Sequence, residues 1–535
     1  MTERAAAVDR AVEVDTVIVG AGFAGLGLGI RLKRAANGSD PDGAGLGSFV
    51  ILERAGDVGG TWRDNVYPGV ACDIPSHLYS YSFRTKPDWT HVYPRGAELQ
   101  EYLRECAREE GLLPHLRFGE PVTAATWDED ARRWLVRTSR ARYAARVLVS
   151  AVGRLSEPRI PAIAGLESFP GHTLHTASWD TSLPLAGARV GLVGTGASAV
   201  QLLPHLAQEA AHVTVFQRHA PYVVPRDDRA YSAAELETFA DPRERARVRE
   251  TIFWDAEAAF PQRQGVPAAI GALRERARAH RERQVRDVDL LAALTPDYEI
   301  GCKRVLLSDD FYPAIGRENV TLEASALDAV DGATGIAASG ARHDLDVLVF
   351  ATGFHATRPP FAELVTGRGG IRLSEHWANG MRAYASTVVH GFPNFFVLDG
   401  PNASLGHNSA VYMIEAQLDY VLGALRHLRE AAVPSRTVPG DAKPGEAEPL
   451  DVPQEAEDAY VSSLDAAAAD TVWLSGCTSW YVDDRSGRLT LLWPGYAHTF
   501  RERNGTFDAR VFQRARAGLR EGAASTVPVV AQRAR

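Results

Sequence analysis

Two copies of one nucleotide-binding pattern constrain this chain more than any other feature of its sequence. The first copy is a β-branched run, VDTVIVG, followed by Gly20-x-Gly22-x-x-Gly25 and a helical stretch, AGLGLGIRLKRA. In such a unit the first glycine permits a tight turn, the second lets the backbone approach a pyrophosphate, and the third allows close helix–strand packing. The pyrophosphate then lies at the positive end of the helix. We therefore predict a dinucleotide-binding βαβ unit here.

The strand that follows this unit, SFVILER, ends in an acidic residue, Glu53. A carboxylate at this position can accept hydrogen bonds from both ribose hydroxyls of a dinucleotide. Glu53 lies 28 residues beyond Gly25, which exceeds the usual spacing of about 20. The turn-rich segment 37–48 accounts for the excess. Glu53 is therefore the predicted ribose ligand.

The second copy differs at the position that selects the nucleotide. The strand ARVGLVG leads into Gly194-Thr195-Gly196-x-x-Ala199, and the next strand, HVTVFQR, ends in Arg218. Arginine can pair with a 2′-phosphate, whereas an acid would repel it. One unit with an acid and one with an arginine predict two nucleotides, and we expect FAD and NADPH, with hydride transfer from nicotinamide to flavin. The alternative is that Arg218 pairs with a nearby carboxylate.

The expected fold class is α/β, with two Rossmann-like dinucleotide-binding domains and a helical insertion. The predicted FAD-binding domain is discontinuous and comprises residues 14–150 and 355–535. The predicted NADP-binding domain comprises residues 155–220 and 303–352. Residues 225–300 are highly charged with helical apolar spacing, which predicts an insertion of solvated helices.

Composition excludes several other classes of protein. The chain has 535 residues, of which 45% are hydrophobic and 23% charged, as in ordinary globular proteins. Its net charge of −9 argues against a general nucleic-acid-binding protein. No apolar run reaches the roughly 20 residues of a membrane span, and the first residues do not read as a signal peptide. The sequence thus predicts neither a nucleic-acid partner nor a membrane span.

The four cysteines, Cys72, Cys106, Cys302 and Cys477, lie far apart in the sequence. No CxxC or CxxxxC motif is present, so we expect neither structural zinc nor any other metal site, and no redox-active dithiol. This also excludes a pyridine-nucleotide disulfide reductase, which shares the two-nucleotide layout. We interpret the cysteines as free thiols of a cytoplasmic protein, because cytoplasm is reducing.

Two stretches carry a resemblance to a known family. ILERAGDVGGTWRDNVYPGVACDIPSHLYSYSF (51–83) resembles the segment after the FAD site of Baeyer–Villiger monooxygenases, which are class B flavin monooxygenases. FPGHTLHTASWD (169–180) matches their fingerprint F-x-G-x-x-x-H-x-x-x-W-(P/D) through Phe169, Gly171, His175, Trp179 and Asp180. The resemblance covers about 14–225 and 300–500.

The resemblance implies roles for further residues. It places Thr61, Trp62, Thr352 and Gly353 at the cofactors and pairs Lys303 with Arg218 at the 2′-phosphate. It gives His175, with Trp179 and Asp180, a part in coupling domain movement to cofactor binding, and it places Trp480 at the substrate or nicotinamide pocket. Taken alone, His175 could instead be a satisfied interdomain histidine, Trp179 a core residue and Asp180 a cap.

The resemblance also implies the reaction. Arg304 matches the active-site arginine of the family, and Asp73 matches the acid that pairs with it. In the family a C4a-peroxyflavin anion attacks a ketone and an oxygen atom enters beside the carbonyl, giving an ester or lactone. A fixed guanidinium can stabilise the negative charge of the peroxide and of the adduct. We thus expect NADPH, O2 and a small-molecule ketone as reactants; the oligomeric state is not predicted.

Three alternatives stay open at this point. The first is an N- or S-oxygenating flavin monooxygenase of the same fold, in which no arginine is needed for a carbonyl adduct. The second is a non-catalytic protein that binds flavin and NADPH. In the third, Asp73 and Arg304 form an ordinary surface ion pair.

Overall fold

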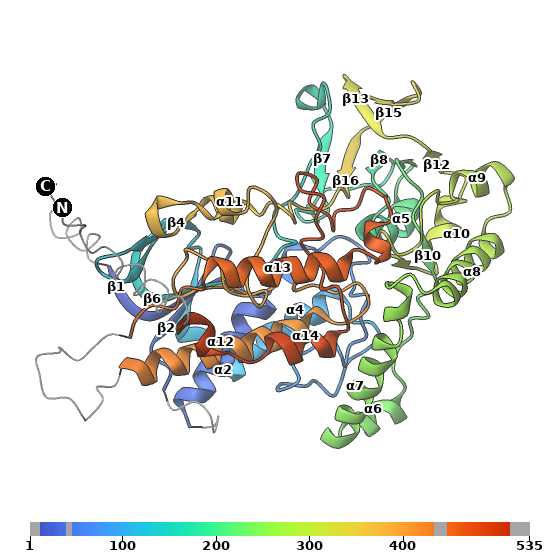
Figure 1. Ribbon diagram of the computed structural model, residues 1–535. Coiled ribbons are helices and arrows are strands. Elements are labelled where there is room, and N and C mark those ends of the chain that lie inside the picture. Colours follow the sequence, from blue (N-terminus) through green and yellow to red (C-terminus); the bar gives the residue numbers. More distant parts are fainter. Residues whose placement is uncertain (1–10, 39–44, 433–446, 514–535) are drawn as a thin grey trace, which may run out of the picture.

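The chain folds around two separate β-sheets. The computed structural model describes residues 11–38, 45–432 and 447–513 (Figure 1). Each sheet contains one of the two glycine-turn units, and helices cover the sheet faces. The expected α/β class with two Rossmann-like units is confirmed.

The first sheet has eight strands, in the order β17-β4-β5-β6-β1-β2-β3, with β18 pairing β6. Its parallel part, β6-β1-β2-β3, includes the first glycine-turn unit, while β4, β5 and β6 pair antiparallel. Strand β2 is buried throughout, as a parallel strand covered on both faces requires. The strands are β1 (Val12–Val19), β2 (Phe49–Glu53), β3 (Leu116–Phe118), β4 (Val122–Asp128), β5 (Arg133–Thr138), β6 (Arg142–Ser150), β17 (Val365–Thr366) and β18 (Phe395–Val397).

Two strands of this sheet come from much later in the chain. β17 pairs β4 and β18 pairs β6, both in parallel. The long helix α12 (Ala410–Ala432) packs on α2 (Phe23–Ala36), the helix of the first unit. Gly27 makes this approach possible, because a Cβ there would lie 3.0 Å from Leu418. The C-terminal part of the chain is thus built onto the first nucleotide-binding unit.

The second sheet has five parallel strands, in the order β12-β9-β8-β16-β7. Helices α5 (Ala197–Glu209) and α10 (Phe311–Ile315) pack together beside it. The strands are β7 (His172–His175), β8 (Arg189–Val193), β9 (His212–Phe216), β12 (Val320–Glu323) and β16 (Val347–Phe350). The described residues also form two small sheets. One pairs β10 (Val223–Val224) with β11 (Leu306–Leu307), and the other consists of β13 (Leu327–Asp331), β14 (Thr334–Ala337) and β15 (Arg342–Asp344).

Helices fill the segment between the strands β10 and β11, at the right of Figure 1. Ser232 and Asp241 cap the first two of them, and Ser232 forms a capping box with Glu235. They are α6 (Ala233–Phe239), α7 (Pro242–Glu257), η3 (Phe260–Gln262), α8 (Pro267–Gln284) and α9 (Val288–Ala293). We call these helices the insertion.

The remaining helices lie elsewhere along the chain. They are α3 (Thr61–Asp64), α4 (Gly96–Glu109), η1 (Leu113–His115), η2 (Leu166–Ser168), η4 (Pro360–Glu363), η5 (Arg368–Gly370), α11 (Leu373–His376), α13 (Gln454–Ala468), η6 (Val472–Leu474) and α14 (Ala497–Asn504). The exact domain boundaries stay a prediction, and residues 39–44, 433–446 and 514–535 of the expected FAD-binding domain lie outside the described residues.

A buried carboxylate fastens the insertion to the C-terminal part of the chain. Glu257, at the end of α7, accepts hydrogen bonds from His407 Nε2 (3.0 Å), Asn408 Nδ2 (2.9 Å) and His498 Nδ1 (2.6 Å). The backbone amides of Ala497 and His498 donate to it as well. Burial alone would raise the pKa of Glu257, but these hydrogen bonds outweigh it and lower the pKa to about 2.

This depressed pKa predicts that Glu257 stabilises the fold in a defined pH range. Its contribution is fully present above the ordinary glutamate pKa of about 4.5 and is lost as pH falls towards 2, and it totals about 3 kcal/mol. Glu257→Gln should therefore lower the free energy of unfolding at pH 7, and the difference from the wild type should shrink at pH 3.5. Denaturant unfolding at both pH values measures this.

The matched control is Glu244→Gln, which changes an exposed ion pair with Arg247 on the same helix. It should alter the free energy of unfolding by less than about 1 kcal/mol at either pH. A difference between the Glu257→Gln variant and the wild type that stays constant from pH 7 to pH 3.5 would contradict the assignment.

Candidate active site

In the first glycine turn, the fold requires a glycine at two positions and leaves room for a side chain at the third. Gly20 has φ +105°, and a Cβ there would lie 2.5 Å from the carbonyl oxygen of Ala151. A Cβ on Gly25 would lie 1.9 Å from the carbonyl oxygen of Gly20. Gly22 is different, because the nearest atom to its Cβ would be Gly60 Cα at 3.8 Å. The fold leaves the space beside Gly22 open.

This open space lies at the N-terminus of α2, where Gly22 is the N-cap. The Gly59 amide donates to the carbonyl oxygen of Ala21 (2.9 Å), so a second glycine pair lines the same place. Thr61 then begins α3 with its side chain exposed, and Trp62 is buried with its ring edge-on to Tyr79. A pyrophosphate fits here, since a helix N-terminus attracts anions and no side chain obstructs it.

Glu53 lies beside this turn, as its place at the end of β2 predicts. Its carboxylate is buried and accepts hydrogen bonds from the amides of Ala21 and Ala55, both at 2.9 Å. Arg63 forms an ion pair with it at 2.9 Å. A carboxylate has about four lone-pair sites, so a ribose hydroxyl can still bind to Glu53. That role stays a prediction.

The second glycine turn repeats the division seen in the first. Gly194 has φ +106°, and a Cβ there would lie 2.8 Å from the carbonyl oxygen of Ala351, whereas nothing lies within 4 Å of a Cβ on Gly196. Gly196 is the N-cap of α5. Thr195 Oγ1 donates to the carbonyl oxygen of His219 (3.1 Å), which fixes the turn to the end of β9. The residues of this turn also fit a dinucleotide.

Two cations lie near this second turn. Arg218 is exposed two residues after β9, and among the described residues it forms no ion pair. Lys303 Nζ lies 4.4 Å from the ring centroid of Tyr298. Burial, followed by the charge of Arg218, lowers the pKa of Lys303. Mutual repulsion of two cations favours an anionic ligand between them, and the alternative pairing of Arg218 with a carboxylate is not seen.

The histidine of the fingerprint joins two strands of the second sheet. His175, at the end of β7, accepts a hydrogen bond from the Ala177 amide on Nδ1 and donates from Nε2 to the carbonyl oxygen of Gly353, both at 3.1 Å. Burial lowers the pKa of His175. Thr352 donates its hydroxyl to the carbonyl oxygen of Arg159. The structure thus brings His175, Thr352 and Gly353 together and keeps the imidazole neutral.

Trp179 and Asp180 lie apart from this cluster. Trp179 packs against the core of the second sheet. Asp180 is exposed, and its carboxylate accepts hydrogen bonds from the amide (2.9 Å) and hydroxyl (2.6 Å) of Ser182. In this conformation the two residues stabilise a core and a turn.

Asp73 and Arg304 form the ion pair that the resemblance implies. Arg304 donates from Nε (2.8 Å) and from a terminal nitrogen (2.5 Å) to one carboxylate oxygen of Asp73. The side chains are 29% and 25% exposed, so the pair is partly desolvated but still reachable. The charge of Asp73 is the largest influence on Arg304 and raises its pKa well above the ordinary value. Arg304 is therefore a permanent, oriented cation.

Three residues of this region were not predicted from the sequence. Tyr481 is buried and, after Asp73, is the second group that raises the pKa of Arg304. Arg154 pairs with Asp399, and burial lowers the pKa of Arg154 to about 10. Arg154 follows shortly after β6 and Asp399 after β18, at the carboxyl ends of adjacent parallel strands, where α/β proteins bind ligands. This position after the strands was the signal by which the sequence could have identified Arg154 and Asp399.

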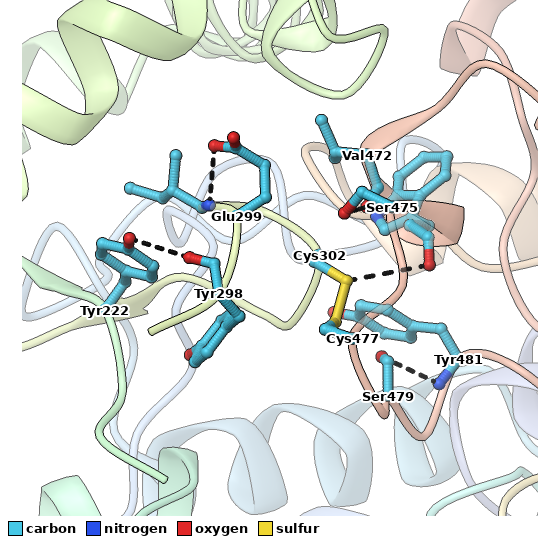
Figure 2. The surroundings of a disulfide bond; sticks show 11 residues. Tyr222, Tyr298, Glu299, Cys302, Val472, Ser475, Cys477, Ser479 and Tyr481 are labelled. Carbon is cyan, nitrogen blue, oxygen red and sulfur yellow. Dashed lines mark hydrogen bonds between the residues drawn. A yellow bond between two sulfur atoms is a disulfide. The ribbon is translucent and has the colours of Figure 1, made fainter. Parts of the chain in front are cut away.

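The expectation that all four cysteines are free thiols is wrong. Cys302 and Cys477 form a disulfide with their Cα atoms 6.3 Å apart, although 175 positions separate them (Figure 2). Cys72 and Cys106 are free and buried. Trp480, three residues after Cys477, is 41% exposed and packs on Tyr481 with ring centroids 4.5 Å apart. The disulfide thus joins the loop of Trp480 to the segment of Arg304.

Comparisons with known proteins place this arrangement in a family. Residues 17–238 match the model of the pyridine nucleotide-disulphide oxidoreductase family. A Baeyer–Villiger monooxygenase of Streptomyces coelicolor is 41% identical, with 94% of this chain and 92% of that protein covered. One of Pseudomonas aeruginosa is 36% identical, with 92% and 90% covered. An oxidized steroid monooxygenase bound to NADP is similar in structure, with a TM-score of 0.76, 30% identity, and 95% and 98% of the chains covered.

The fold and the paired nucleotide turns define a two-dinucleotide flavoprotein of the monooxygenase class. Within that class, the chain belongs to the Baeyer–Villiger monooxygenase family. The resemblance drawn from the sequence is confirmed. In the described part of the chain, no helix combines the length and apolarity that crossing a membrane would need.

Substituting the two kinds of glycine should have different effects, one on stability and one on FAD binding. Gly25→Ala forces a Cβ into backbone and should destabilise the fold by about 1–3 kcal/mol or more. Gly22→Ala should leave the thermal stability of the flavin-free protein unchanged but weaken FAD binding about tenfold or more, since the Cβ enters the pyrophosphate space. Thermal unfolding of the flavin-free protein and FAD titration measure both. Equal losses of stability in the two variants would argue against this division.

Arg218→Ala should discriminate between the nicotinamide cofactors. A guanidinium–phosphate bond is charge-assisted, so its loss should raise the KM for NADPH about 10- to 100-fold and leave the KM for NADH little changed. Steady-state NADPH and NADH oxidation measures this. An equal increase for both cofactors would show that Arg218 does not bind the 2′-phosphate.

Proposed function

We propose that this protein uses FAD, NADPH and O2 to insert an oxygen atom beside the carbonyl of a small-molecule ketone, giving an ester or lactone. The observation that carries the proposal is the oriented Arg304–Asp73 ion pair in a chain that also has two dinucleotide-binding turns. Family membership supports the monooxygenase chemistry. The ketone is supported by the names of relatives, which include a cyclohexanone monooxygenase of 26% identity.

The two turns divide the cofactors between them. The open space at Gly22, with Glu53 beside it, would hold FAD, and the space at Gly196, with Arg218 and Lys303, would hold NADPH. Flavin, when bound, would accept a hydride and activate O2. The chain itself binds and orients both nucleotides, and the neutral His175 keeps β7 attached to the end of β16.

Arg304 would stabilise negative charge during oxygen insertion. Its guanidinium is held by two hydrogen bonds to Asp73, so it need not reorganise as charge develops. Because Asp73 raises its pKa, Arg304 keeps its proton throughout and acts as a fixed cation, neither acid nor base. The same charge distinguishes this site from an N- or S-oxygenating one, which has no carbonyl adduct to stabilise.

The boundaries of the two domains are part of the proposal. Strands β17 and β18 support assigning residues after 355 to the FAD-binding domain, and β12 and β16 support assigning 303–352 to the NADP-binding domain. A cytoplasmic location stays a prediction from the sequence.

Arg304→Ala should separate cofactor use from oxygen insertion. The variant should bind FAD and oxidise NADPH with release of hydrogen peroxide, while ester formation falls about 10²- to 10³-fold. Asp73→Ala should give a smaller loss, since the arginine remains charged but is less well oriented. NADPH oxidation, peroxide assay and mass-spectrometric product analysis across a ketone panel measure these effects.

Arg274→Ala serves as the control, because it removes an exposed arginine of α8 that pairs with Glu299. It should keep the wild-type ester rate. If Arg304→Ala forms ester near the wild-type rate, the assignment of this arginine is wrong, and the N- or S-oxygenating alternative becomes the better reading.

A further inference from the structure

We propose that the Cys302–Cys477 disulfide is a reducible tether that positions the loop of Trp480 and Tyr481 against Arg304, so that its redox state sets how efficiently NADPH oxidation leads to oxygen insertion. The inference rests on the proposed function for its second half only. The tether itself concerns loop position and is testable without any substrate.

The disulfide links the two segments beside their functional residues. Cys302 lies two positions before Arg304, and Cys477 lies four positions before Tyr481. In Figure 2 the disulfide bridges the two chain segments, with Ser479 and Tyr481 on the Cys477 side. Tyr481 is close enough to Arg304 to raise its pKa. The disulfide therefore joins the two segments that carry Tyr481 and Arg304, and it restricts how these segments lie relative to each other.

Few hydrogen bonds tie residues 475–480 to other segments of the described chain, whereas the buried Tyr481 and the partly buried Val482 pack in an apolar cluster with Leu489 and Leu492. The Ser475 amide donates to the carbonyl oxygen of Val472 (3.2 Å), and the amides of Tyr481 and Val482 donate to Ser479 (3.3 and 3.2 Å). In the described chain, these hydrogen bonds of 475–482 all stay within the loop and the adjoining η6. The anchor before the loop is the Val472 amide, which donates to the carbonyl oxygen of Arg263 (3.0 Å). Opening the disulfide thus removes the covalent link between residues 475–480 and the segment of Arg304, while the packing of Tyr481 remains.

A reductant can reach the disulfide from one side. Cys302 is fully buried, but Cys477 is partly exposed and follows the exposed residues Ser475 and Gly476. Thiolate attack at the Cys477 sulfur is therefore open, and accessible disulfides are the labile ones. The free cysteines Cys72 and Cys106 are buried, and burial raises the pKa of Cys106 to about 12, so neither competes in exchange.

The redox step balances with a dithiol as the reductant. A dithiol transfers two electrons and two protons; the S–S bond breaks, Cys302 and Cys477 become thiols, and the dithiol closes to its own disulfide. In the reverse direction one hydrogen peroxide takes up two electrons and two protons from the thiols and becomes two waters as the bond forms. The tether can thus be opened and restored in the assay.

Hydrogen exchange of the FAD-loaded holoenzyme, with and without dithiothreitol, tests the tether directly. Denaturing thiol titration should find two thiols before reduction and four after it. Reduction should increase amide exchange across 475–480 at least about tenfold, while exchange in β1 and β8 stays unchanged. Four thiols before reduction, or unchanged exchange in the loop after it, overturns the proposal.

The consequence for catalysis is measured as ester formed per NADPH consumed. Reduction should lower this ratio and raise the ketone KM severalfold, with FAD retained. The Cys302→Ala/Cys477→Ala variant, and Cys477→Ala alone should the double variant not fold, should behave as the reduced enzyme with or without dithiothreitol. Cys106→Ala should respond to dithiothreitol as the wild type does.

The two proposals fail in different ways. An unchanged ratio and KM on reduction, in an enzyme that does form ester, overturns the link between tether and catalysis. Absence of ester from the oxidised wild type with every ketone contradicts the proposed function instead, while the hydrogen-exchange result still decides whether the tether exists.

Discussion

The ion pair between Asp73 and Arg304 is the interaction on which the rest of the site depends. Its members are 231 positions apart, and each follows a different part of the fold: Asp73 the first nucleotide-binding unit, Arg304 the insertion. The pair forms only when both parts are in place. Partial burial strengthens the attraction between the charges, and Asp73 in return keeps Arg304 protonated. The guanidinium of Arg304 is thus oriented only once the two parts of the fold have assembled.

Around this pair the two glycine turns follow one physical rule. At Gly20, Gly25 and Gly194 a side chain would meet backbone atoms, so these glycines serve the packing of strand, turn and helix. At Gly22 and Gly196 a Cβ would meet open space, so the absence of a side chain there serves a ligand. The same motif therefore contains glycines under two different constraints, and contact distances separate them.

Long-range links hold the more variable parts against this framework. Glu257 joins the insertion to the loop of His407 and to the start of α14, because one buried carboxylate accepts hydrogen bonds from both. The Cys302–Cys477 disulfide joins the Trp480 loop to the segment of Arg304. Both links join segments outside the two large sheets, where they add specific bonds to the apolar packing.

The sequence by itself determined the α/β class, the two nucleotide units, the helical character of 225–300 and the contrast between Glu53 and Arg218. These are local patterns, since strand, turn and helix follow from residues within a short window. The Asp73–Arg304 pair was predicted only through a family resemblance. The disulfide, the influence of Tyr481 on Arg304 and the Arg154–Asp399 pair, 245 positions apart, were decided by the tertiary structure. Their partners are far apart in the chain, and only the packing of the two sheets and the insertion brings them within bonding distance.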